Sequence, residues 1–184
     1  MPKTKRKTAE ERALPGYHIR WMIRRDMPEV LAIEKASFDV PWTEDEIIKM
    51  LRQRSVIAQV VECRGEVVGF CIYELQKHRL EIINLAVKPD CRRLGVGRAV
   101  IDKLAQKLAL KRRNRLCMLV RETNLPAQLF LKAVGFVATA VAQACIVQYS
   151  KRLGLPEDAL WFESCLIEPG NGGRCEPCEE ECEC

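Results

Sequence analysis

The segment of residues 80–108 constrains the fold of this 184-residue chain more than any other stretch. Residues 80–87 form an apolar, β-branched run that is typical of a buried strand. From Val96 onward, apolar residues recur at helical spacing, which predicts an amphipathic helix over residues 96–108. Residues 92–97, Arg-Arg-Leu-Gly-Val-Gly, lie between them. We therefore expect a buried strand that turns directly into a helix through a glycine-containing loop.

This loop has the composition of a phosphate-binding site. Gly95 and Gly97 lack the side chains that would keep an anionic ligand away from the backbone. The first turn of the helix offers unpaired N–H groups and about half a positive charge. Arg92, Arg93 and Arg98 add full positive charges around it. The residues therefore predict a ligand that carries a pyrophosphate.

The spacing of the loop excludes two common phosphate-binding motifs. A dinucleotide fingerprint requires a small residue three places after Gly97, but Val100 stands there. It also requires an acidic residue about 20 positions further on, where residues 115–117 are Arg-Leu-Cys. A nucleotide P-loop would need Gly-Lys-Ser or Gly-Lys-Thr, and the sequence contains neither.

The segment instead resembles the acetyl-CoA motif of the GNAT acetyltransferase family, Arg/Gln-x-x-Gly-x-Gly/Ala. Arg92, Gly95 and Gly97 match that motif, after an Ile-Asn-Leu-Ala-Val strand at residues 83–87. A second similarity is Val-Arg-Glu-Thr-Asn-x-x-Ala at residues 120–127, followed by a helical pattern and Gly-Phe.

A third similarity narrows the resemblance to one branch of the family. Residues 33–44, Ile-Glu-Lys-Ala-Ser-Phe-Asp-Val-Pro-Trp-Thr-Glu, look like the segment between the first two helices of the RimI-type enzymes, which acetylate the N-terminal amine of a ribosomal protein. In total the resemblance covers about residues 17–168. It implies an α/β (α+β) GNAT fold, with a mixed central sheet of about six to seven strands flanked by about four helices.

The resemblance also implies acetyl-CoA as the acyl donor and assigns residues to it. Backbone groups of Leu85, Ala86 and Val87 would polarise the thioester carbonyl. Asn124 would contact the pantetheine arm, and it can equally cap the helix that follows. The loop completes the predicted coenzyme site with Arg92, Arg93, Leu94, Gly95, Val96, Gly97 and Arg98.

The sequence departs from the RimI-type pattern at both catalytic positions. Where those enzymes carry a glutamate base and a tyrosine acid, this chain has Leu119 and Leu131. We therefore predict substitutes, with Glu122 as the base and Tyr149 as the acid. Other candidates for these roles are Glu81, Glu74 and Tyr73.

The predicted function is acetyl-CoA-dependent N-acetylation of a protein N-terminal α-amine, in the manner of the enzymes that act on a ribosomal protein. An α-amine of pKa about 8 is roughly a tenth neutral at pH 7, so that slow transfer can proceed without a dedicated base. Acetylation of a small-molecule amine or a protein lysine is one alternative. The other is an acyl-CoA-binding module without turnover, which Leu119 and Leu131 favour.

Local signals predict how several elements begin and meet. Asp26 with Glu29 is expected to cap a first helix, and Thr43 with Glu46 has the pattern of a capping box for a second. Residues 55–75 have the pattern of a β-hairpin. Gly69 within its second strand predicts a bulge or a close backbone approach.

Composition favours one domain with two tails. A hydrophobic content of 48% is enough for a single core. Residues 1–16 are rich in Lys and Arg and are expected to be a flexible arm, whereas residues 169–184 form a Gly-containing and then Cys/Glu-rich tail that we expect to be disordered. Four of the ten cysteines lie in that tail. Their spacing is tighter than that of a paired Cys-x-x-Cys zinc site, so no metal site is predicted.

The sequence predicts a cytoplasmic protein. No run approaches the roughly 18 apolar residues of a membrane span, and the N-terminus lacks the apolar stretch of a secretory signal. The cysteines are expected to be reduced there. The net charge of +5 is modest, and no DNA or membrane partner is expected, although the resemblance leaves room for association with the ribosome.

Overall fold

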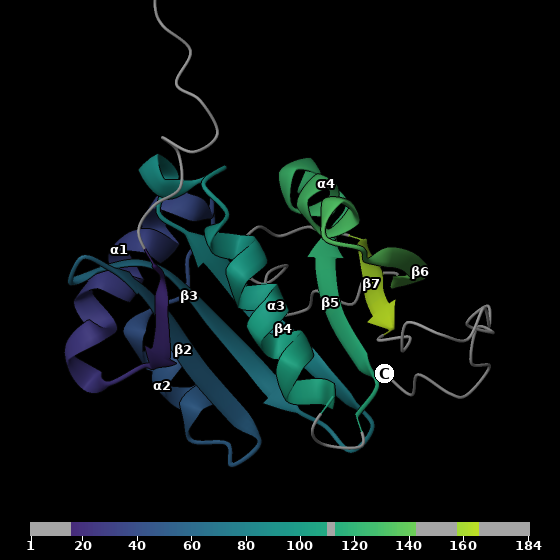
Figure 1. Cartoon of the computed structure of the whole chain (residues 1–184), viewed down its shortest axis with the longest axis horizontal. Coiled ribbons are helices and arrows are strands. Elements are labelled where there is room, and N and C mark those ends of the chain that lie inside the picture. Colours follow the sequence, from purple (N-terminus) through teal and green to yellow (C-terminus); the bar gives the residue numbers. More distant parts are fainter. Residues whose placement is uncertain (1–15, 110–112, 143–157, 166–184) are drawn as a thin grey trace, which may run out of the picture.

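The protein is organised around one seven-stranded sheet with the strand order β1-β2-β3-β4-β5-β7-β6 (Figure 1). The computed structural model describes residues 16–109, 113–142 and 158–165. The strands are β1 His18–Trp21, β2 Val56–Cys63, β3 Glu66–Leu75, β4 Arg79–Val87, β5 Arg115–Arg121, β6 Val137–Ala142 and β7 Ala159–Cys165. The helices are α1 Met27–Ser37, α2 Glu44–Leu51, α3 Val96–Ala109 and α4 Leu125–Ala133, with short 3₁₀ turns η2 Arg24–Asp26 and η3 Pro89–Cys91.

This architecture confirms the predicted mixed sheet with its flanking helices. The predicted tails, residues 1–16 apart from Gly16 and residues 169–184, lie outside the described residues, as does Tyr149. Across the three described ranges, no helix combines the length and apolar character needed to cross a membrane.

Two apolar clusters cover the two faces of the sheet. One contains α1 and α2 side chains, such as Val30 and Ile47, packed on residues of β2, β3 and β4. The other contains the predicted apolar stripe of α3, including Val100 and Leu104, together with Leu131 of α4. Figure 1 shows α3 lying along the sheet, with α4 beside it over β5 and β7. We refer below to the α1/α2 face and the α3/α4 face.

The strands β4 and β5 are parallel and separate part of the way along. They pair only from Arg79 with Arg115 to Ile82 with Met118. Beyond that point β4 stays paired with β3 as far as Val87, while β5 stays paired with β7. A register shift between β3 and β4 occurs at the same place and bends β4. The edge of β4 after Ile82 therefore faces a gap between the two strands.

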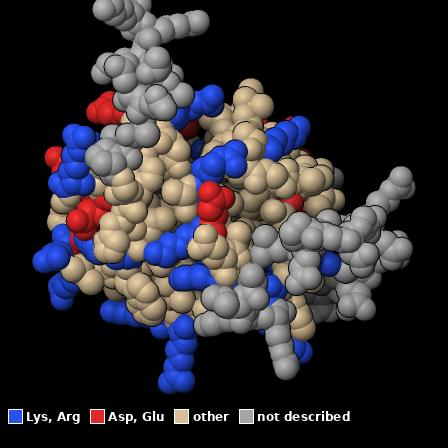
Figure 2. All heavy atoms as spheres, viewed as in Figure 1, with Lys and Arg blue, Asp and Glu red and all other residues tan. Residues whose placement is uncertain are grey.

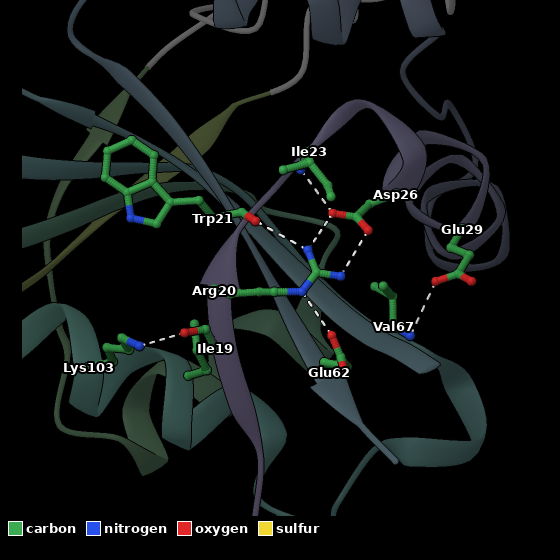
Figure 3. A network of polar contacts seen from close by, with 9 residues as sticks. All are labelled: Ile19, Arg20, Trp21, Ile23, Asp26, Glu29, Glu62, Val67 and Lys103. Atoms are coloured by element: carbon green, nitrogen blue, oxygen red, sulfur yellow. Dashed lines mark hydrogen bonds and ion pairs between the residues drawn. The ribbon is translucent and has the colours of Figure 1, made fainter. Parts of the chain in front are cut away.

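An ion-pair network attaches the edge strand β1 to the domain (Figure 3). Arg20 donates to both carboxylate oxygens of Asp26, at 2.6 and 2.9 Å, and to Glu62 at 2.8 Å. These bonds lower the pKa of Asp26, most of all through the Arg20 guanidinium. Lys103 of α3 donates to the carbonyl of Ile19 at 2.6 Å. The strand is thus tied to β2, to the start of α1 and to α3.

The predicted cap formed by Asp26 and Glu29 is wrong. Asp26 precedes α1, but its side chain makes no capping hydrogen bond to that helix. It accepts from the Ile23 N–H and binds the Arg20 guanidinium, which attracts the carboxylate as a full charge. Glu29 instead accepts a hydrogen bond from the Val67 N–H at 3.2 Å. Asp26 and Glu29 therefore bond to groups outside α1 instead of capping that helix.

Candidate active site

The loop between β4 and α3 curls in a way that only some residues permit. Arg93 and Gly95 have positive φ angles of 62° and 93°. An added Cβ at Gly95 would meet no described atom within 4 Å, so the backbone conformation, rather than packing, favours glycine there. The Ala99 N–H donates to the Gly95 carbonyl at 2.9 Å and begins the helical ladder. The N–H groups before it lack intrahelical acceptors, as at the start of any helix, and groups of this kind can bind an anion.

Gly97 has a different role from Gly95. A Cβ at Gly97 would lie 3.0 and 3.1 Å from ring atoms of Phe130 in α4. Glycine therefore lets α4 pack closely against the start of α3. The sequence interpretation, in which Gly97 exposes the backbone to a ligand, did not include this packing role.

Two side chains hold the loop in place. Arg92 donates from Nε to the Val87 carbonyl at 3.0 Å and from Nη2 to Ser37 Oγ at 2.9 Å. The Tyr17 hydroxyl donates to the Leu94 carbonyl at 2.6 Å. These bonds connect the loop to β4, to the end of α1 and to the residue before β1. Arg92 therefore braces the loop while keeping its charge near it.

The other two loop arginines differ in their hydrogen bonds. Arg98 donates to the Ala133 carbonyl at 2.7 Å, where the end of α4 carries partial negative charge. Arg93 is exposed, and its guanidinium makes no hydrogen bond or ion pair within the described part of the chain. Arg93 is consequently the loop arginine that is most available to an anionic ligand.

Basic side chains are also spread beyond the loop. Figure 2 shows lysine and arginine over much of the face that carries α3, with fewer acidic groups between them. These basic side chains do not gather into one patch. Their distribution therefore favours the approach of an anionic ligand to the whole face.

The predicted carbonyl-polarising residues lie along the open edge of β4. Leu85, Ala86 and Val87 all follow Ile82, the last residue that pairs with β5. Their strand stays close to β3, because Gly69 allows an approach in which an added Cβ would lie 3.0 Å from the Ala86 carbonyl oxygen. This contact and the adjacent register shift confirm the bulge and close approach predicted at Gly69.

Asn124 lies at the matching end of β5. Its Oδ1 accepts from the Ala127 N–H at 3.2 Å and caps α4, as predicted. Its Nδ2 donates no hydrogen bond among the described residues. Because β4 and β5 are parallel, the starts of α3 and α4 lie at the same edge of the sheet. A ligand at the Gly95 loop can therefore extend between the strands toward Asn124.

The two positions that the sequence resemblance assigned to an acid and a base hold no proton-transferring side chain. Leu131 is fully buried in the core on the α3/α4 face. Leu119 is half-buried and follows Met118, so it is the first β5 residue beyond the paired part. The structure thus gives Leu131 a packing role and leaves Leu119 beside the gap.

Glu122 lies beyond the end of β5, and its side chain is exposed. Its N–H donates to the Asp158 carbonyl, which continues the extended pairing of the strand. Glu122 follows Leu119 by three residues and lies in the turn after the strand rather than on the strand itself. The structure does not bring Glu122 to the position that Leu119 occupies.

A buried carboxylate, which the sequence interpretation missed, connects the α1–α2 segment to β4. Glu34 accepts from the Trp42 N–H at 2.9 Å and from Asn84 Nδ2 at 3.1 Å, and its side chain is inaccessible to solvent. Burial raises the pKa of Glu34, although both hydrogen bonds oppose the shift. Its helical spacing from Val30, on the apolar side of α1, was the available signal. Glu34 fixes the segment against the α1/α2 face of β4.

The start of α2 completes this segment. Thr43 and Glu46 form the predicted capping box, with the Thr43 N–H donating to the Glu46 carboxylate at 2.7 Å. The Pro-Trp pair at residues 41–42 is therefore held at both ends, by Glu34 before it and by the cap after it.

No group of three or more His, Cys, Asp or Glu side chains in the described ranges is arranged to hold a metal ion. The four cysteines of residues 175–184 lie outside those ranges.

The fold and the site together define a class of enzyme. The start of α3, where an anion can bind, follows β4, and β4 runs beyond its last pair with the parallel strand β5. This arrangement suits an acyl-coenzyme A, with the pyrophosphate at the helix and the acyl arm between the strands.

The chain belongs to the acetyltransferase (GNAT) family, because the model of that family matches residues 27–136. The protein is therefore an N-acetyltransferase, and acetyl-CoA is its acyl donor.

Several known proteins are similar to this chain. A Bacillus subtilis relative, provisionally named a ribosomal protein bS18-alanine N-acetyltransferase, is 30% identical over 118 residues, which are 64% of this chain and 78% of the relative. The Escherichia coli K12 ribosomal protein bS18-alanine N-acetyltransferase is 28% identical over 111 residues, 60% of this chain and 74% of the relative.

Solved structures have the same fold. The crystal structure of the E. coli ribosomal-protein-S18-alanine N-acetyltransferase superposes with a TM-score of 0.70 at 22% identity, over 86% of this chain and 99% of that one. A GNAT acetyltransferase from Elizabethkingia anophelis with acetyl-CoA bound gives a TM-score of 0.65 at 14% identity, over 83% of this chain and 99% of that one.

Proposed function

We propose that this enzyme acetylates the N-terminal α-amine of a protein, and that a ribosomal protein is the acceptor. The observation that carries the proposal is the absence of a proton acceptor at Leu119, because this loss penalises acceptors of high pKa most. The bS18-alanine N-acetyltransferase names of two relatives support it. Such an acceptor would place the reaction in the cytoplasm and bring the enzyme to the ribosome.

The chemistry explains why the α-amine is favoured. The neutral amine attacks the thioester carbon, a C–N bond forms and the C–S bond breaks, and the departing CoA thiolate takes up the proton that the nitrogen loses. Backbone groups of Leu85, Ala86 and Val87 are proposed to stabilise the oxyanion in between. At pH 7 roughly a tenth of an α-amine of pKa about 8 is neutral, against less than about a thousandth of a lysine of pKa about 10.4.

The lack of a glutamate at Leu119 then determines which amines can be acetylated. A general base is typically worth about 10² to 10⁴ in rate. A site with a weakened or displaced base still acts on the reactive α-amine and becomes very slow on lysine. The segment that holds Trp42 through Glu34 lies on the α1/α2 face of β4, and we propose that the acceptor peptide approaches there.

Release of the CoA thiol tests the proposal. The enzyme would be given acetyl-CoA and a peptide with an N-terminal alanine and one internal lysine. The matched control is the same peptide with a formylated N-terminus. We expect thiol release with the free peptide and a loss of more than about tenfold with the formylated one.

Two results would contradict this acceptor. Equal rates with the free and formylated peptides would assign the activity to lysine. Tight CoA binding with a flat trace for every peptide and small amine would instead support the acyl-CoA-binding module that Leu119 and Leu131 favour.

A further inference from the structure

The end of the sheet opposite the coenzyme loop carries exposed charge of one sign. Three connections lie there: residues 22–26 between β1 and α1, residues 52–55 between α2 and β2, and residues 76–78 between β3 and β4. Their only acidic residue is Asp26, which is buried and paired with Arg20. Their lysine and arginine side chains are all exposed, and we call them the basic strip: Arg24, Arg25, Arg52, Arg54 and Lys77.

The strand register brings these three connections side by side. The Met22 N–H donates to the Ala58 carbonyl at 3.0 Å, and the Leu75 N–H donates to the Ser55 carbonyl at 2.8 Å. These bonds join the end of β1 to β2 and the start of β2 to the end of β3. Adjacent strands lie about 4.8 Å apart, so β1 to β4 span about 14 Å. Figure 2 shows Lys and Arg side chains along the lower edge of the molecule, where Figure 1 places α2.

The protein does not use the charges of the basic strip for its own contacts. None of its five side chains makes a hydrogen bond or ion pair with any residue of the described ranges. By contrast, Arg79 on the adjacent strand donates to Gln76 at 2.6 Å and to Glu81 at 3.4 Å. The basic side chains on the face that carries α3 are spread out, whereas those of the strip follow one another along neighbouring connections. Like charges gathered in this way repel one another unless an anion binds them.

A tryptophan lies beside the basic strip. The side chain of Trp21 is 67% exposed, although large aromatic side chains are usually mostly buried. Its backbone is held firmly, because Trp21 pairs with Gln59 and its carbonyl accepts from Arg20 Nη1 at 3.2 Å. Figure 3 shows the indole on the opposite side of β1 from the Arg20 guanidinium. Arg24 follows three residues later, so that the ring lies within about 10 Å of the strip along the chain.

We propose that the basic strip and Trp21 bind single-stranded RNA, with phosphates on the strip and a base stacked on the indole. Cations that follow the backbone, together with an aromatic ring for a base, are the two components of such sites. A membrane surface would require a broad apolar face. Among the described residues at this end, only Trp21 and Ile23 are large, apolar and exposed.

The position of the basic strip leaves the coenzyme site open. The strand β4 runs from Arg79, beside the strip, to Val87, just before the coenzyme loop. At about 3.3 Å per residue this separation is about 26 Å, well beyond the Debye length of about 8 Å at physiological salt. RNA and CoA are therefore expected to bind independently. RNA binding does not depend on the acceptor; only its role, which is to hold the enzyme on an RNA-rich particle, rests on the ribosomal acceptor proposed above.

Fluorescence anisotropy of a labelled, unstructured oligouridine of about 12 nucleotides, titrated with the full chain, tests the proposal. Arg54→Ala/Lys77→Ala should raise the Kd for RNA about tenfold at low salt. It should also reduce the slope of log Kd against log salt by about 1.4, because each phosphate contact contributes about 0.7. Trp21→Ala should raise the Kd at least about fivefold without changing that slope, whereas Trp21→Phe should keep most of the affinity.

The matched control is Lys35→Ala/Arg64→Ala, which removes the same two kinds of charge from exposed positions away from the strip. This control should change the Kd for RNA by less than about threefold. Residues 1–15 are identical in all these variants, so that any contribution of this basic segment cancels in the comparison.

The possible outcomes are distinct. Equal weakening by the strip variant and the control would overturn the proposal, because general charge attraction would then explain the binding. Displacement of RNA by saturating CoA would place the RNA at the coenzyme loop and would also overturn it. Tighter, Trp21-dependent binding to vesicles of phosphatidylserine and phosphatidylcholine than to RNA would assign the surface to a membrane. RNA binding as expected, in an enzyme that acetylates only lysine, would support this proposal and refute the ribosomal acceptor.

Discussion

The buried carboxylate of Glu34 allows a prediction whose magnitude follows from its contacts. In the Glu34→Ala variant, the Trp42 N–H and the Asn84 Nδ2 group lose their acceptor in the interior. Each buried donor without a partner costs about 1–3 kcal/mol. We therefore expect Glu34→Ala to lower the free energy of unfolding by about 2–6 kcal/mol, a large part of the typical stability of a domain.

The same side chain gives stability a defined dependence on pH. Its folded-state pKa is raised by burial, so the folded protein binds this proton more tightly than the unfolded chain does. The contribution of Glu34 is fully present below its unfolded pKa, about 4.3, and is lost as the pH rises through the folded value. Glu34→Gln cannot titrate, and the Asn84 amide can rotate to donate to or accept from it. We expect this variant to gain stability relative to the wild type as the pH rises through that window.

Urea unfolding of the wild type, Glu34→Ala and Glu34→Gln, followed at several pH values, measures both effects. Glu44→Ala, an exposed position at the start of α2, is the matched control and should change stability by less than about 1 kcal/mol. The reasoning would be refuted if Glu34→Ala were as stable as this control. It would also be refuted if the difference between wild type and Glu34→Gln did not change with pH.

Three further predictions concern the coenzyme loop. Gly95→Glu should weaken CoA binding by more than about tenfold in calorimetry. The control Gly65→Glu, also at a positive φ in open space, should cost similar stability and leave the Kd for CoA unchanged. Equal affinities of the two variants for CoA would contradict the proposed anion site. Gly97→Ala should lower the Tm, because overpacking against Phe130 costs about 1–3 kcal/mol and the gain in helix propensity is only about 1 kcal/mol. Adding Phe130→Leu to the Gly97→Ala variant should restore the Tm. If this second change does not restore the Tm, the packing role of Gly97 is excluded. Arg93→Ala should raise the Kd for CoA about threefold at low salt and less at high salt, and a loss that does not depend on salt would contradict a direct charge interaction.

Local chemistry made part of the site predictable. The strand and helix of residues 80–108 follow from hydrophobic periodicity, and the Thr43–Glu46 box follows from groups three residues apart. Asp26 shows the limit of such reasoning. Its pattern with Glu29 was that of a helix cap, but Arg20 and the Ile23 N–H offered stronger partners from outside the helix.

The sequence by itself determined the turn from β4 into α3, because glycine conformation, helix N-termini and capping act over a few residues. The tertiary structure alone decided where β4 and β5 separate, that Gly97 meets Phe130, and that Glu34 reaches Asn84 from a helix 50 positions earlier. It also placed Glu122 in the turn after β5, beyond the part of the strand that holds Leu119. These relations depend on the register between strands that are distant in the chain, which is set by how all the elements pack together and not by any local pattern.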